Sequence, residues 1–88
     1  MRYRVAWTAS AQQHLASVWL ASDQRQSVTS AAARIDAELR NDPETKGESR
    51  RGGVRVVIAR PLGVEFEVIP EDRTVYVLSV WTTERTAP

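Results

Sequence analysis

The chain has 88 residues, of which 12 are basic and 11 acidic, and its formal net charge of +1 gives a weak overall field, so any contact with nucleic acid must come from a local basic patch. It contains no cysteine, which excludes disulfides, thiolate metal sites and a cysteine nucleophile. At this length we expect one domain over residues 1–88, with a modest core that leaves room for an obligate protein partner.

The N-terminal residues lack the apolar stretch of a signal peptide or of a membrane helix. We therefore expect a cytoplasmic protein that does not associate with membranes. The chain also contains no phosphate-binding loop, no dinucleotide fingerprint and no zinc-ligand spacing. No cofactor and no metal ion are expected on these grounds.

The first element is predicted over residues 2–7, where polar and apolar side chains alternate with the period of a strand. In such a strand Arg2 and Arg4 face solvent or a ligand. The apolar set, which faces the core, comprises Tyr3, Val5 and Trp7.

Two helices are predicted next. The first begins at Thr8 or at Ser10, which forms a capping-box pattern with Gln13. Its apolar residues recur at helical spacing: Ala11, Leu15, Val18 and Trp19. The second helix begins near Ser22–Asp23 or at Ser27 and is ended by Pro43. Its apolar stripe comprises Val28, Ala31, Ala32, Ile35 and Leu39. Two helices this close in sequence should form a hairpin.

The second half of the chain predicts a loop and three strands. Residues 41–53 are polar and rich in glycine, which is typical of a loop. Strands follow at 54–60, 64–68 and 75–80, and the turns between them contain proline and glycine or charged residues, so these strands should form an antiparallel meander. The predicted order is β-α-α-β-β-β, an α+β fold in which a helical hairpin packs on one face of a small antiparallel sheet.

Alternation also predicts which side chains face the helices. If Val64, Phe66 and Val68 face the core, then Glu65 and Glu67 lie on the opposite face. We expect Arg2, Arg4 and Arg55 to join these two glutamates. In the last strand we expect Tyr76, Leu78 and Val80 to face the core, and Ser79 and Trp81 to lie on the outer face.

The stretch GESRRGGVRVVIARP, residues 47–61, contains four arginines in a short span: Arg50, Arg51, Arg55 and Arg60. Together with Trp81 they have the composition of a surface that binds a phosphate backbone through charge and stacking. The same residues also fit a solvated loop and a sheet face with exposed Arg–Glu pairs, each worth less than about 1 kcal/mol. By residue type alone both interpretations stay open.

Other candidate groups are weaker. The single histidine, His14, lies on the first predicted helix, far in sequence from the arginines, and is interpreted as a structural or solvated side chain. Glu65 and Glu67 share one face of a strand, a pattern too common to indicate a metal site or an acid–base pair.

Three segments together resemble the RelE/ParE superfamily of toxins from type II toxin–antitoxin systems: YRVAWTASAQQHL, AAARIDAELRNDP and GESRRGGVRVVIARPLGVEFEVIPEDRTVYVLSVW. Their order and spacing cover nearly the whole chain. The resemblance implies a small cytoplasmic toxin that inhibits growth, often as part of a plasmid stabilization system. It also implies a cognate antitoxin protein that neutralises the toxin in a hetero-oligomer.

The resemblance implies two kinds of target. RelE-like members cleave messenger RNA on the ribosome, and ParE-like members bind DNA gyrase. The RelE-like catalytic pattern has basic residues on the second and third strands and an arginine and a tyrosine near the C-terminus. Here the third strand has Glu65 and Glu67 instead, and no tyrosine follows the last strand. The catalytic residues are therefore unknown, and the candidates are Arg55, Arg60 and Arg85.

Three functions follow from the resemblance. In the first, the chain is a ParE-like toxin that binds an essential target through Arg50, Arg51, Arg55, Arg60 and Trp81. In the second, it is a metal-independent, ribosome-dependent endoribonuclease. In the third, it is an inactive interaction module that has kept only its partner-binding surface.

Overall fold

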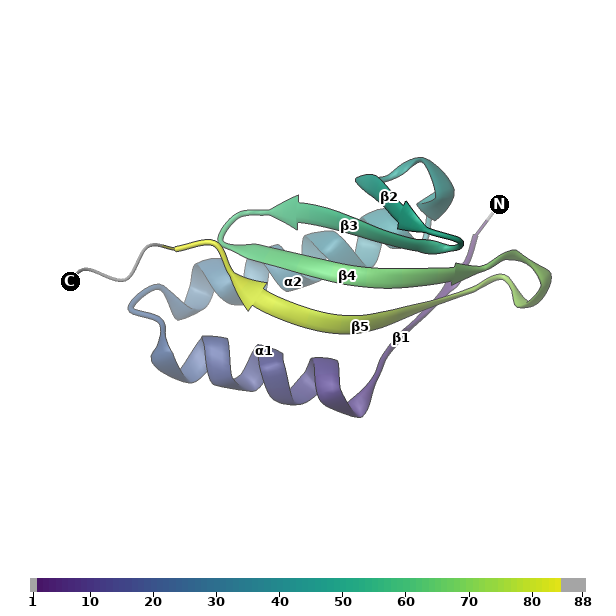
Figure 1. Cartoon of the computed structure of the whole chain (residues 1–88). Coiled ribbons are helices and arrows are strands. Elements are labelled where there is room, and N and C mark those ends of the chain that lie inside the picture. The colour runs from purple at the N-terminus through teal and green to yellow at the C-terminus, as the bar shows by residue number, and fades with distance from the viewer. Residues whose placement is uncertain (1, 85–88) are drawn as a thin grey trace.

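A computed structural model describes residues 2–84 and contains two helices packed on one face of a five-stranded sheet (Figure 1). The helices are α1 (Ala9–Ala21) and α2 (Arg25–Leu39), and short 3-10 helices cover Pro43–Thr45 and Pro70–Asp72. The strands are β1 (Arg4–Trp7), β2 (Glu48–Arg51), β3 (Val54–Ala59), β4 (Leu62–Ile69) and β5 (Thr74–Thr82). Their order across the sheet is β1-β5-β4-β3-β2. The predicted α+β class and helical hairpin are confirmed.

The sheet is mixed, whereas the sequence predicted an antiparallel one. The meander of β3, β4 and β5 is antiparallel, as expected, but β1 pairs with β5 in parallel. A parallel pair requires a long crossover between its strands, and here the helical hairpin lies within that crossover. Alternation within residues 2–7 predicts a strand but contains no information about the direction of its neighbour.

Strand β2 lies inside the stretch predicted to be a loop. It pairs antiparallel with β3 across a two-residue Gly52–Gly53 turn, and Gly52 has a φ of 53°, a left-handed conformation that glycine adopts without strain. All four residues of β2 are exposed, because β2 forms the edge of the sheet beyond the helices. An exposed edge strand needs no apolar alternation, so the usual sequence signal is missing.

A side-chain cap sets the start of α1, whereas α2 begins without one. Thr8 is the N-cap of α1 and accepts a hydrogen bond from the backbone N–H of Ala11 at 3.1 Å, which selects the first of the two predicted starts. Helix α2 begins at Arg25, between its two predicted starts. It ends at Leu39, and Pro43 instead opens the following 3-10 helix.

The predicted facing of β5 is wrong before the bulge in this strand and correct after it. Val75 and Val77 face the helices, opposite Val68 and Phe66, so Tyr76 lies on the outer face. A bulge then leaves Leu78 without a partner and reverses the alternation, which returns Val80 to the core. Ser79 and Trp81 consequently lie on the outer face, as predicted.

The core lies between the helices and the sheet. The predicted set Val64, Phe66 and Val68 is buried there, and Phe66 is the largest fully buried side chain. The helices contribute Ala11, Val28, Ala31, Ile35 and Leu39. Among residues 2–84, neither helix combines the length and the apolar character needed to cross a membrane.

Helix α1 also covers the edge of β5 where β1 ends. The backbone N–H and the hydroxyl of Thr8 both donate to the carbonyl oxygen of Val77, at 3.1 and 3.0 Å. Further along the same helix, Nδ1 of His14 accepts a hydrogen bond from the backbone N–H of Val80 at 3.3 Å. The exposed histidine therefore substitutes for a missing strand partner, which is a structural role.

Candidate functional site

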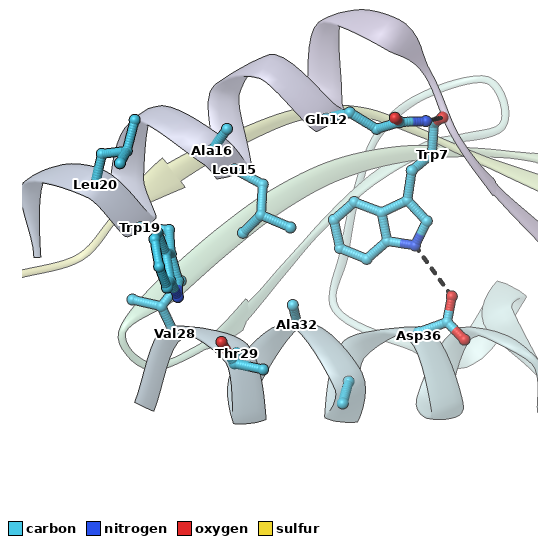
Figure 2. Close-up of a pocket in the computed structure, with 11 residues that line it drawn as sticks. Trp7, Gln12, Leu15, Ala16, Trp19, Leu20, Val28, Thr29, Ala32 and Asp36 are labelled. Carbon is cyan, nitrogen blue, oxygen red and sulfur yellow. Dashed lines mark hydrogen bonds between the residues drawn. The ribbon is translucent and has the colours of Figure 1, made fainter. Parts of the chain in front are cut away.

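An open, apolar groove lies between α1 and α2, and we call it the helix groove. It encloses about 800 Å³ and its wall is almost entirely apolar. Figure 2 shows side chains from both helices and from β1 converging on it. The main contributors are Trp7, Leu15, Trp19, Leu20, Val28 and Ala32.

One end of the helix groove is held by a polar network. The indole of Trp7 points between the helices, and its Nε1 donates to Oδ1 of Asp36 at 3.0 Å (Figure 2). The other carboxylate oxygen of Asp36 accepts from Nε of Arg40 at 2.9 Å. This network satisfies the one polar atom of the indole and leaves its apolar surface facing the groove.

The opposite end of the helix groove exposes two large apolar side chains. Leu20 is 64% exposed and Trp19 is 39% exposed. The guanidinium of Arg25 lies 4.6 Å from the centre of the Trp19 ring and donates to the carbonyl oxygens of Trp19 and Leu20, both at 3.0 Å. Arg25 thus caps the C-terminal end of α1 while the apolar side chains remain uncovered.

Sequence reasoning missed this groove because it assigned Trp7 and Trp19 to the core. The available signal was the width of the apolar arc on α1, where Ala16, Trp19 and Leu20 extend beyond the stripe that meets the sheet. A helix that covers one sheet needs a narrower stripe.

The predicted basic residues do not form one continuous patch. Arg50 and Arg51 lie on β2 and Arg55 lies near the start of β3. Arg60 lies beyond the other end of β3, in the turn to β4, which Figure 1 shows at the opposite end of the sheet from the β2–β3 turn. Five residues of extended strand separate Arg55 from Arg60 by roughly 17 Å.

Arg55 does not lie on the outer face with the glutamates. It pairs with Phe66 in the sheet register and therefore projects to the side that carries the helices. Its Nε donates to the carbonyl oxygen of Lys46 at 2.7 Å, and Nη2 donates to that of Gly47 at 3.1 Å. The outward side of β3 is apolar instead and comprises Val54, Val56 and Ile58. The arginine therefore anchors the segment before β2.

Trp81 lies flat on the outer face, over Gly63 of β4. A Cβ atom on Gly63 would come within 2.5 Å of the indole, so the absence of a side chain there makes room for the ring. Trp81 is 37% exposed and Ile58 continues the same row of the sheet. One side of the ring thus remains available for contact.

The centre of the outer face is acidic. Glu65 pairs with Ser79 of β5 and Glu67 pairs with Tyr76, whereas their partners on β3 are the apolar Val56 and Val54. The hydroxyl of Ser79 lies 3.5 Å from Oε1 of Glu65. The expected Arg55–Glu pairs do not form, and within residues 2–84 the one ion pair joins Arg40 to Asp36. The two carboxylates disfavour a phosphate group at the centre of this face.

The remaining site predictions concern Arg85 and metal ligands. Arg85 lies outside the described residues, so its candidacy stays a prediction. Within residues 2–84 no three acidic or histidine side chains gather as metal ligands.

No protein-family model matches this chain, and no curated protein matches it in sequence. Solved structures do match it in fold. The toxin–antitoxin complex RelBE2 from Mycobacterium tuberculosis aligns with a TM-score of 0.77 and 18% identity, over 96% of this chain and 95% of that chain. The chromosomal ParDE system from P. aeruginosa aligns with a TM-score of 0.70 and 17% identity, over 94% of this chain and 98% of that chain. A mutant of toxin RelE from E. coli in the free state aligns with a TM-score of 0.69 and 22% identity, over 96% of this chain and 86% of that chain. The chain therefore has the fold of the RelE/ParE toxins.

Proposed function

We propose that the chain is the toxin of a type II toxin–antitoxin system, which inhibits growth by binding an essential target and is neutralised by a cognate antitoxin. The observation that carries this proposal is the open, apolar helix groove on a fold shared with RelE and ParE toxins. A free protein rarely exposes an apolar surface of this kind without a partner to cover it. Such a toxin acts in the cytoplasm and stabilises a plasmid that encodes it.

The groove suits an amphipathic helix of the antitoxin. Two helices form its walls, so a third can place apolar side chains at helical spacing between Trp7 at one end and Leu20 at the other. Covering the exposed part of one leucine of this size contributes about 1–2 kcal/mol.

Binding of a target, rather than RNA cleavage, fits the outer face. Cleavage needs cations around the scissile phosphate and groups that transfer protons. Glu65 and Glu67 occupy the middle of that face, and Arg55 is engaged by two backbone carbonyls. Arg50, Arg51, Arg60 and Trp81 remain candidates for contact with a protein target such as DNA gyrase.

The first test is inducible expression in a bacterium that has no antitoxin, with growth and RNA 5′ ends followed at early times. We expect growth arrest with intact transcripts. New, codon-phased 5′ ends would instead indicate a ribosome-dependent nuclease. Normal growth at high expression would contradict the toxin assignment and favour an inactive interaction module.

The second test identifies the antitoxin by its effect. A library of host genes is selected for clones that restore growth to cells expressing the toxin. We then expect Leu20→Asp to arrest growth as before while the suppressor no longer restores it, because the charge blocks the helix groove. Ser17→Asp, on the exposed side of α1, is the matched control and should still be neutralised. Equal suppression of both variants would exclude the groove as the antitoxin site.

A further inference from the structure

A second pocket lies on the other side of α2 from the helix groove. It encloses about 340 Å³ between the N-terminal half of α2 and the turn that joins β3 to β4. Its wall is half polar, in contrast to the groove. The lining comprises Gln26, Ser27, Ser30, Ala31 and Arg34 of α2, and Arg60 of the turn.

Two arginines share this pocket and no acidic residue lines it. Within residues 2–84, neither Arg34 nor Arg60 has a carboxylate within ion-pair distance or a hydrogen-bond acceptor for its guanidinium. Other arginines of the chain are engaged, as Arg25 and Arg55 show by their bonds to backbone carbonyls. Two like charges on one pocket repel each other, and an anion between them removes that cost.

The remaining polar groups of the pocket also include hydrogen-bond donors. Ser27, Ser30 and Arg34 follow one another at spacings of three and four residues, so they lie on one face of α2. No side-chain hydrogen bond of either serine occurs within the described residues, so both hydroxyls are free to donate. A pocket lined by two cations and two free hydroxyls matches a group that only accepts hydrogen bonds.

We propose that the pocket between Arg34 and Arg60 is an oxyanion site that binds a phosphate group. Guanidinium groups form paired, charge-assisted hydrogen bonds with phosphate oxygens, and the serine hydroxyls supply donors for the oxygens that remain. Ala31 is the one buried residue of the lining and the others are exposed, so the ligand would bind at the surface of the protein. The site is separate from the acidic outer face and from the helix groove.

The test is an NMR titration of the complete, nitrogen-15-labelled chain with sodium phosphate, with sodium acetate at the same ionic strength as the reference. We expect saturable shifts at Ser27, Ser30, Arg34 and Arg60, with a dissociation constant of about 1 mM or lower. Phosphate that fails to saturate these signals, or acetate that shifts them equally, would overturn the proposal.

Substitutions distinguish phosphate binding in this pocket from a general attraction to the positive charge of the protein. Arg34→Gln combined with Arg60→Gln should weaken phosphate binding about tenfold or more. Arg4→Gln, on the opposite face of the sheet, removes one positive charge and should leave binding unchanged. An equal loss in both would contradict a local site. The same spectra report whether each variant is folded.

A single-stranded oligonucleotide distinguishes the sources of the phosphate. If it shifts the same residues and is displaced by free phosphate, the ligand is a nucleic-acid backbone. If only free phosphate binds, the ligand is a small phosphorylated compound. Failure of both overturns the site. Phosphate binding does not depend on toxicity, so a chain that binds phosphate without arresting growth would reject the proposed toxin function alone.

Discussion

Helix α2 separates two surfaces of opposite character. On one side Val28 and Ala32 line the helix groove, whose wall is apolar. On the other side Ser30 and Arg34 line a polar pocket with Arg60. The contrast shows that a single helix, whose buried stripe faces the sheet, can present two chemically different surfaces on its flanks. Contacts in the groove depend on buried apolar area, whereas contacts in the pocket depend on charge.

The largest expected effect comes from a charge placed in the groove. Ala32→Glu should weaken binding of the genetically identified suppressor protein by about 100-fold, because docking would bury a carboxylate among apolar side chains. The measurement is the affinity of the purified proteins. Phosphate binding on the far side of α2 should not change.

Ala37→Glu is the matched control, because Ala37 is an exposed residue of the same helix outside both surfaces. Suppressor binding that survives Ala32→Glu would mean that the partner covers some other surface. Loss of phosphate binding in the same variant would mean that the two sides of α2 are coupled.

A third region, the outer face of the sheet, can be tested through the packing of Trp81 on Gly63. Gly63→Ala should destabilise the fold by about 1–3 kcal/mol, because the new methyl group overlaps the Trp81 indole. Chemical unfolding measures the loss, and tryptophan fluorescence in a Trp7→Phe, Trp19→Phe background reports displacement of the ring. An unchanged emission spectrum together with unchanged stability would disprove the close packing of Trp81 on Gly63.

The hydrogen bond between Trp7 and Asp36 should stabilise the free protein, because it holds one end of the helix groove. Asp36→Ala removes the acceptor of the half-buried Trp7 indole N–H and should cost about 1–2 kcal/mol in free energy of unfolding. Asp36→Asn keeps an oxygen acceptor and loses the Arg40 pair, so it should cost only about 0.5 kcal/mol. Equal losses in the two variants would show that the indole hydrogen bond contributes nothing.

The smallest expected effect is a difference in salt dependence between phosphate binding and suppressor binding. Raising sodium chloride to about 1 M shortens the screening length to about 3 Å and should weaken phosphate binding several-fold. Suppressor binding in the apolar groove should change less than about twofold, because burial of apolar area is not screened. Similar salt dependence of the two affinities would contradict the assignment of one surface to charge and the other to apolar contact.

Local patterns predicted much of the fold. Alternation along residues 64–68 identifies the core face of β4, and helical spacing identifies Val28, Ile35 and Leu39 as the buried stripe of α2. These predictions hold because each depends on a period that neighbouring residues define among themselves. The family resemblance rests on the same local signals in their order along the chain.

The features that failed depend on residues distant in sequence. The bulge at Leu78 reverses the facing of β5, and only pairing with β4 reveals it. The direction of β1 and the strand nature of residues 48–51 likewise depend on their partners. Arg55 is drawn to the carbonyl oxygens of Lys46 and Gly47 by a register that its own strand does not encode.

The two proposed binding surfaces also depend on residues that are distant in sequence. The helix groove exists because Trp7 from β1 meets the space between two helices, and the phosphate pocket exists because the β3–β4 turn brings Arg60 beside Arg34. Residue type supplied the apolar and basic side chains. Tertiary packing decided which of them converge, because convergence depends on chain reversals that no local period records.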